Sequence, residues 1–121
     1  MLKFRLSLKG DRFMNKKLTP ITPGDVLLEE FLLPMEISQN QLAKAINVPA
    51  NRINQIINGK REITADTALR LGKFFGIEPE FWLNLQLRFN MKIAQEKHGA
   101  EIEKEVKAYK PKMDNFQTAT A

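Results

Sequence analysis

The sequence predicts an all-α fold of five to six helices. From about residue 20 to residue 97, apolar residues recur at spacings of three and four, which is the period of an amphipathic helix. Runs of alternating β-branched and polar residues, which mark strands, do not occur in this segment. At 121 residues the chain is long enough for one domain with a modest core and too short for two, because a domain usually spans roughly 100–200 residues.

Helix-capping residues divide the chain into successive helices. The first is predicted to begin at Thr22, with Pro23 at its first helical position, and to end at Pro34. The second is predicted to begin at Ser38, where Gln41 completes a capping box. The other expected helices span residues 50–58, 65–76, 78–97 and, as a marginal last helix, 101–109.

The segment at residues 51–61, NRINQIINGKR, separates into two faces on a helical wheel. The apolar face holds Ile53, Ile56 and Ile57, and the polar face holds Asn51, Asn54, Gln55 and Asn58. Residues 38–61 contain four basic residues and no acid. Asn47, which tolerates the left-handed conformation, joins this helix to the preceding one by a tight turn. Two short helices joined in this way, the second with an acid-free amide face, are typical of a helix-turn-helix motif.

The chemistry of double-stranded DNA explains this composition. Amide side chains match adenine N6 and N7 in the major groove, arginine matches guanine, and carboxylates would be repelled by phosphate. The expected base-contacting residues are Asn51, Arg52, Asn54 and Gln55. Gln39, at the exposed start of the preceding helix, is expected to contact phosphate, as are Lys60 and Arg61 just past the helix stop.

The helix expected over residues 78–97 carries two apolar stripes. One holds Phe81, Trp82, Leu85, Phe89 and Ile93, and the other holds Leu83, Leu87, Met91 and Ala94. One stripe can face the core of the domain, whereas the second needs another surface to cover it. We therefore expect a homodimer in which Leu83, Leu87 and Met91 lie at the contact. Phe81 and Trp82 are expected to serve packing rather than base stacking.

The net charge of +5 comes from the first seventeen residues, where six basic residues face one acid. We expect a basic, disordered leader over residues 1–18, a DNA-binding domain that includes the dimerising helix over residues 19–98, and a marginal helix with a tail over residues 99–121. Met14 is an alternative start that would remove most of this leader.

Several function classes find no support in the composition. The chain has no cysteine and a single histidine, His98, so thiolate chemistry and multi-histidine metal sites are excluded. Nucleotide-binding and metalloprotease motifs are absent, and we expect neither an enzyme nor a cofactor. No apolar run reaches the roughly 18 residues of a membrane span, and the charged N-terminus does not resemble a secretory signal, so we expect a cytoplasmic protein.

Residues 39–58, QNQLAKAINVPANRINQIIN, resemble the helix-turn-helix of the phage-repressor (XRE) superfamily, which implies a lambda-repressor-like fold. The wider segment over residues 18–97 resembles the HigA branch of antitoxins, and its ITADTALRL and FWLNLQ segments are specific to that branch. The family usually has glycine at the turn position that Asn47 occupies here, and the basic leader has no counterpart in it.

This resemblance implies a dimeric antitoxin that binds a HigB-type toxin, an mRNA-cleaving ribonuclease, and represses their shared operon. A dimer that places two recognition helices about 34 Å apart would suit a palindromic operator. Two alternatives remain: a stand-alone repressor of the same fold without a toxin, and a protein-interaction module that no longer binds DNA. Against the second alternative stands the acid-free basic segment over residues 38–61.

Overall fold

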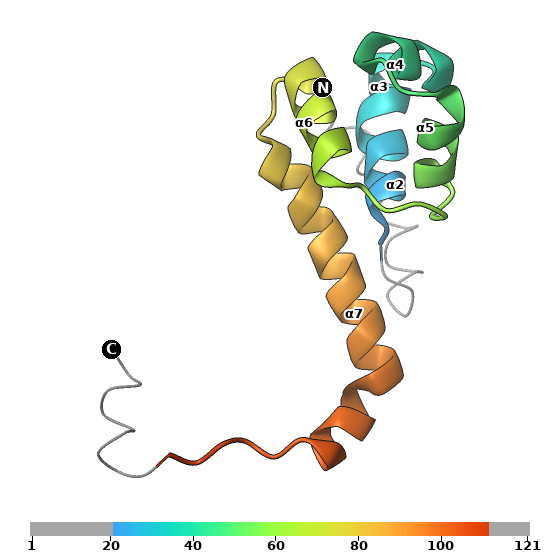
Figure 1. Ribbon diagram of the computed structural model, residues 1–121. Coiled ribbons are helices and arrows are strands. Elements are labelled where there is room, and N and C mark those ends of the chain that lie inside the picture. The colour runs from blue at the N-terminus through green and yellow to red at the C-terminus, as the bar shows by residue number, and fades with distance from the viewer. Residues whose placement is uncertain (1–20, 112–121) are drawn as a thin grey trace.

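The computed structural model describes residues 21–111, and the regular elements of this part of the chain are all helices, with no strand (Figure 1). In chain order the elements are α2 (Pro23–Val26), the π-helical η1 (Leu27–Leu32), α3 (Leu33–Met35), α4 (Gln39–Ile46), α5 (Ala50–Ile57), α6 (Ala65–Phe75) and α7 (Pro79–Glu105). The first three form one continuous rod, so the described part has five helices, within the predicted five to six. The predicted leader and the tail after residue 111 lie outside the described residues.

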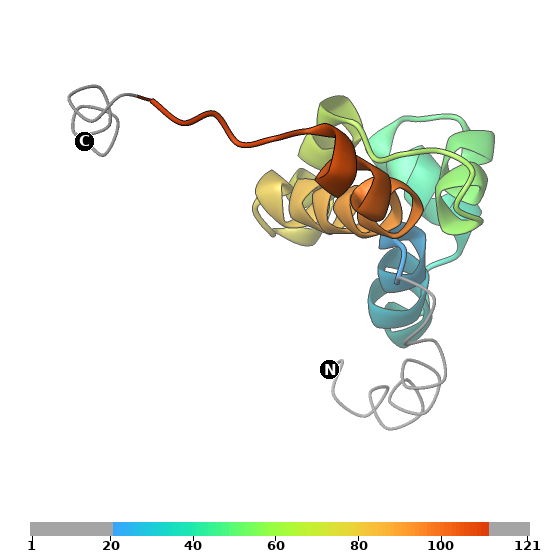
Figure 2. The same ribbon diagram turned by 90° about the horizontal axis from the view of Figure 1, so that it is seen from below.

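The rod occupies the middle of the domain (Figure 1). The α4–α5 pair lies on one side of it, and α6 with the first half of α7 lies on the other, where α7 packs on both α6 and α2. Seen from below in Figure 2, α7 runs under the domain and the chain that follows it leads away. The core therefore lies where the rod meets these two pairs.

The predicted helix starts are confirmed. The Gln41 backbone N–H donates to Ser38 Oγ at 3.0 Å, and the Ser38 N–H donates to Gln41 Oε1 at 2.7 Å, which completes the capping box. Thr22 and Thr64 cap α2 and α6 through their side-chain oxygens. Each cap supplies an acceptor to an N–H group that the first turn of a helix leaves without a partner.

Asn47 is confirmed as the turn residue between α4 and α5. Its φ is 60°, and the Val48 N–H donates across the turn to the Ala43 carbonyl at 3.0 Å. This six-to-one hydrogen bond is the closure of a Schellman turn, which needs a residue in the left-handed conformation. Asparagine tolerates that conformation better than most residues, so it can replace the glycine usual at this position.

The prediction that the first helix ends at Pro34 is wrong, because the helix continues to Met35. In the π-helical segment the backbone pairing is shifted by one residue, and the Leu33 N–H donates to the Leu28 carbonyl five residues back. Proline breaks a helix because it lacks an N–H and its ring clashes with the carbonyl four residues earlier. The wider π turn relieves that clash, so the rod passes through Pro34.

The predicted break at Gly99 and the separate last helix are also wrong. One helix, α7, runs from Pro79 to Glu105, and an extended segment follows it up to residue 111. Gly99 does not have the positive φ of a helix-ending glycine. A glycine inside a helix costs only about 1 kcal/mol relative to alanine, and the good helix formers around it offset that cost.

A cluster of aromatic rings holds α7 against the rod and α6. Trp82 is fully buried, and its ring centroid lies 4.9 Å from that of Phe31 and 5.0 Å from that of Phe81. Phe31 lies 4.9 Å from Phe75 of α6. Tilted aromatic pairs each add about 0.5–1.5 kcal/mol to the stabilisation from burial alone. The expected packing role of Trp82 is therefore confirmed.

Gly24 allows α2 to approach the backbone of α5 closely. A Cβ atom at this position would lie 2.8 Å from the Ile57 Cα and closer still to the Ile56 carbonyl oxygen. Both neighbours are backbone atoms and cannot move aside as a flexible side chain could. The absence of a side chain at Gly24 therefore sets the distance between the rod and α5.

We predict that Gly24→Ala destabilises the fold by about 3 kcal/mol, because the added methyl group overpacks a contact between two backbones. Gly99→Ala is the matched control, since a Cβ there meets nothing within 4 Å. It should stabilise α7 by about 0.5–1 kcal/mol. Urea unfolding followed by circular dichroism measures both. Equal stabilities of Gly24→Ala and wild type would show that α2 and α5 do not approach this closely.

Candidate nucleic-acid interface

Helices α4 and α5 form a helix-turn-helix unit seated on the core by buried apolar side chains. These side chains are Leu42, Ala43 and Ile46 of α4 with Ile53 and Ile56 of α5. The predicted apolar face of α5 is thereby confirmed, although Ile57 at its edge is only half-buried. Burial of this face leaves the opposite, amide-bearing face of α5 on the surface.

The outer face of α5 carries the predicted base-contacting side chains. Asn51 and Asn54 are exposed, whereas Arg52 and Gln55 are half-buried at the edges of this face. All four therefore lie on or beside one continuous surface of the helix. Their contact with bases stays a prediction.

A chain of amide hydrogen bonds links α5 to the start of α4. Asn58 Nδ2 donates to Asn54 Oδ1 at 3.2 Å, and Asn54 Nδ2 donates to Gln39 Oε1 at 3.3 Å. Because the Gln39 oxygen accepts this bond, its amide nitrogen is left as a donor at the N-terminus of α4. Such a donor, beside the free backbone N–H groups of the helix, is suited to a phosphate oxygen.

The turn after α5 folds the following basic residues back toward the helix. Lys60 N–H donates to the Gln55 carbonyl at 2.8 Å, and Gly59, with a φ of 75°, occupies the left-handed position. The same turn brings Arg61 Nε within 2.8 Å of Gln55 Oε1, to which it donates. Gln55 therefore accepts one hydrogen bond on its backbone oxygen and another on its side-chain oxygen, from two consecutive residues.

Arg52 has an acidic neighbour that the sequence pattern did not indicate. Its Nη1 lies 3.8 Å from Asp66 Oδ2 of α6, which also accepts a hydrogen bond from Arg70 Nε at 2.9 Å. Arg70 in turn donates from Nη1 to the Ile46 carbonyl at the end of α4. The four-residue spacing of Asp66 and Arg70 is visible in the sequence, but the approach of α6 to Arg52 depends on tertiary packing.

Gln86 anchors the loop between α5 and α6 to α7, a role that sequence reasoning missed. Gln86 is buried, its Oε1 accepts the Ile63 N–H at 2.9 Å, and its Nε2 donates to Asn90 Oδ1 at 3.1 Å. Losing this acceptor would leave a buried N–H without a partner, at a cost of about 1–3 kcal/mol. The one signal in the sequence is a polar residue on the Trp82 side of a helix.

The predicted dimer contacts divide into two environments. Leu83 is half-buried against the domain's own core. Leu87 and Met91 are 57% and 50% exposed, and both lie on the side of α7 that faces away from Trp82. Both are more exposed than Leu83 and lie one turn apart on the same side of α7, so they are the stronger candidates of the three for contact with a second chain.

Other kinds of site find no basis within residues 21–111. No group of three or more histidine, aspartate or glutamate side chains in this part of the chain could hold a metal ion. None of its helices combines the length and apolar character needed to cross a membrane.

Comparisons with known proteins identify the family. A helix-turn-helix family model matches residues 28–82, from η1 into α7. The virulence-associated protein I of Dichelobacter nodosus is 49% identical over 76 residues, which cover 63% of this chain and 70% of that protein. An addiction module antidote protein of the HigA family from Coxiella burnetii is 57% identical, with a TM-score of 0.71, over 74% of this chain and 98% of that one. The chain belongs to the HigA family of helix-turn-helix antitoxins.

Membership of the HigA family confirms the lambda-repressor-like fold and the prediction that the chain is not an enzyme. The structure of the Pseudomonas aeruginosa antitoxin HigA with the higBA promoter is also similar, at 40% identity and a TM-score of 0.73 over 75% of this chain and 99% of that one. The aligned part therefore contains the helix-turn-helix unit of α4 and α5 described above.

Proposed function

We propose that this HigA-family chain is an antitoxin that represses its own operon by binding a palindromic operator as a dimer, and that it neutralises a ribonuclease toxin. The observation that carries DNA recognition is the exposed amide face of α5, seated by Ile53 and Ile56 and bordered by Lys60 and Arg61. It is supported by the similarity to a HigA structure that includes promoter DNA.

Base reading is assigned to the outer face of α5. An amide offers a donor and an acceptor together, so Asn51 and Asn54 can each pair with the major-groove edge of a base, and Gln55 can donate to an acceptor there. Arg52 lies at the flank of α5, with its Nη1 3.8 Å from Asp66 Oδ2, and we assign it to a base at the edge of the same surface. Gln39, Lys60 and Arg61 contact phosphates on either side and fix the register of the helix.

We predict that Gln55→Ala and Arg52→Ala weaken operator binding and relax the preference at one or two base pairs, since each good bidentate contact discriminates by roughly 1–3 kcal/mol. Gel-shift titration of operator and random duplexes measures the effect. Equal losses on both duplexes would exclude a base-reading role for these residues.

Lys60→Ala serves as the contrast, because a phosphate contact carries no sequence information. The affinity of the variant for every duplex should fall, and the slope of log affinity against log salt concentration should become shallower by about one unit. An unchanged slope would remove Lys60 from the phosphate contacts.

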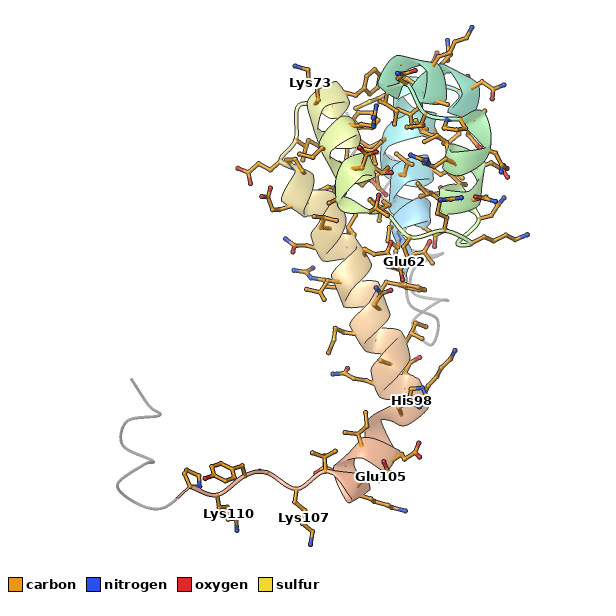
Figure 3. All side chains as sticks on the ribbon, in the orientation of Figure 1. Glu62, Lys73, His98, Glu105, Lys107 and Lys110 are labelled. Atoms are coloured by element: carbon orange, nitrogen blue, oxygen red, sulfur yellow. The ribbon has the colours of Figure 1, made fainter. Side chains whose placement is uncertain are left out.

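The exposed apolar side of α7 is assigned to the dimer contact. The helix has 27 residues, a length of about 40 Å, and its last turns extend beyond the domain body, as the positions of His98 and Glu105 in Figure 3 show. Leu87 and Met91 lie one turn apart on this side, and a second copy of α7 would remove them from water.

We predict that Leu87→Asp produces monomers, because pairing would bury two unpaired carboxylates at the contact. Lys92→Asp is the control, since Lys92 is exposed on a flank of the same helix and should leave the dimer intact. Sedimentation velocity distinguishes the two states. A Leu87→Asp protein that still sediments as a dimer would place the interface elsewhere.

The toxin partner rests on family membership, and the rival reading is a stand-alone repressor of the same fold. The two differ in whether a short, basic, ribonuclease-like reading frame lies next to this gene. We expect the product of that frame to copurify with this chain when both are expressed, and its growth inhibition to disappear in the presence of the chain. If no such frame exists, or if its product does not copurify, the antitoxin proposal fails and the stand-alone repressor is favoured.

A further inference from the structure

We infer that Arg61 is a positioning residue for sequence recognition, acting through Gln55, in addition to any contact it makes with phosphate. This inference rests on the proposed function, because it assigns a role within the DNA-reading surface. It starts from a hydrogen bond between two side chains six residues apart, Arg61 Nε to Gln55 Oε1 at 2.8 Å.

The backbone conformation of the turn after α5 brings Arg61 and Gln55 together. The turn at Gly59 closes with hydrogen bonds from Gly59 N–H to the Ile56 carbonyl at 3.1 Å and from Lys60 N–H to the Gln55 carbonyl at 2.8 Å. The turn therefore brings the chain back to Gln55 one residue before Arg61. The hydrogen bond is also charge-assisted, which makes it stronger than one between two neutral groups.

The bond selects one of two orientations of the Gln55 amide. A free glutamine can turn either its oxygen or its NH2 group toward a neighbour, because the two ends have the same shape. A guanidinium group has only donors, so the flipped amide would set donor against donor. Arg61 therefore keeps the Gln55 oxygen directed toward itself. The NH2 group of Gln55 is then the part of the amide available to a base.

This orientation has a consequence for the choice of base. Guanine presents N7 and O6, adenine presents N7 and thymine presents O4 as acceptors in the major groove, whereas cytosine presents the N4 amino donor. An amide fixed with its donors outward pairs with the first three and opposes cytosine. Arg61 thus adds discrimination at a base pair that it need not contact itself.

The phosphate role and the positioning role use different atoms of the same side chain. Nε is directed to Gln55, while the two terminal nitrogens of the guanidinium group remain for a phosphate oxygen. Lysine can fill the phosphate role, because phosphate accepts a point charge, but its single ammonium nitrogen cannot occupy the Nε position and the terminal positions at once. Arg61→Lys therefore separates the two.

The test begins with a pool of randomised 20-base-pair duplexes, from which wild-type protein selects its preferred sequence. Gln55→Ala then identifies the base pair at which preference is lost, and duplexes carrying each of the four pairs at that position are titrated with every variant. We expect Arg61→Ala to lower discrimination against cytosine at that pair by about tenfold. The double variant Gln55→Ala/Arg61→Ala should discriminate no less than Gln55→Ala alone.

Arg61→Lys should lose the same discrimination while it retains the salt dependence of wild type. Lys60→Ala, an adjacent loss of positive charge, should weaken all four duplexes equally. Circular dichroism of each variant checks that the substitutions leave the fold intact.

Two results would overturn the inference while the proposed function stands: an equal loss on all four duplexes with Arg61→Ala, or full discrimination by Arg61→Lys. A wild-type protein that selects no sequence would overturn the inference and the DNA-reading proposal together.

Discussion

The close approach of α2 to α5 at Gly24 is the constraint on which the position of the amide-bearing face of α5 depends. The rod is fixed on its other side by Trp82 and the aromatic rings around it, so α5 cannot move without disturbing the core. Helix α5 has only 8 residues, too few to be stable alone in water. The packing of Ile53 and Ile56 against the core therefore determines its conformation and fixes the position of its polar face.

Polar contacts then extend this rigidity outward from the core. Gln86 ties the loop after α5 to α7, and Asp66 and Arg70 tie α6 to Arg52 and to the end of α4. These links surround the helix-turn-helix unit on the sides that face the rest of the protein. Arg52, on the flank of α5, and the loop after this helix are thus supported by neighbours from α6 and α7.

Local signals in the sequence predicted a large share of this structure. The capping box at Ser38, the turn at Asn47 and the two faces of α5 each depend on residues within one or two helical turns of one another, and the structure confirms them. The errors at Pro34 and Gly99 concern residue types that usually end helices. A π turn accommodates Pro34 within the rod, and strong helix-forming neighbours keep Gly99 within α7. The contacts of Arg52 and Gln86 join segments that are distant in the sequence, so the periodicity of apolar residues could not predict them.

The amide chain from Asn58 through Asn54 to Gln39 has a thermodynamic consequence. Side chains that bind from a disordered surface lose rotamer freedom on association, at a cost of about 0.5–1.5 kcal/mol each. Here the hydrogen bonds among these amides restrict the rotamers before any ligand arrives, so part of that entropy has already been lost during folding. The fold therefore bears an ordering cost that would otherwise reduce the affinity of the interface.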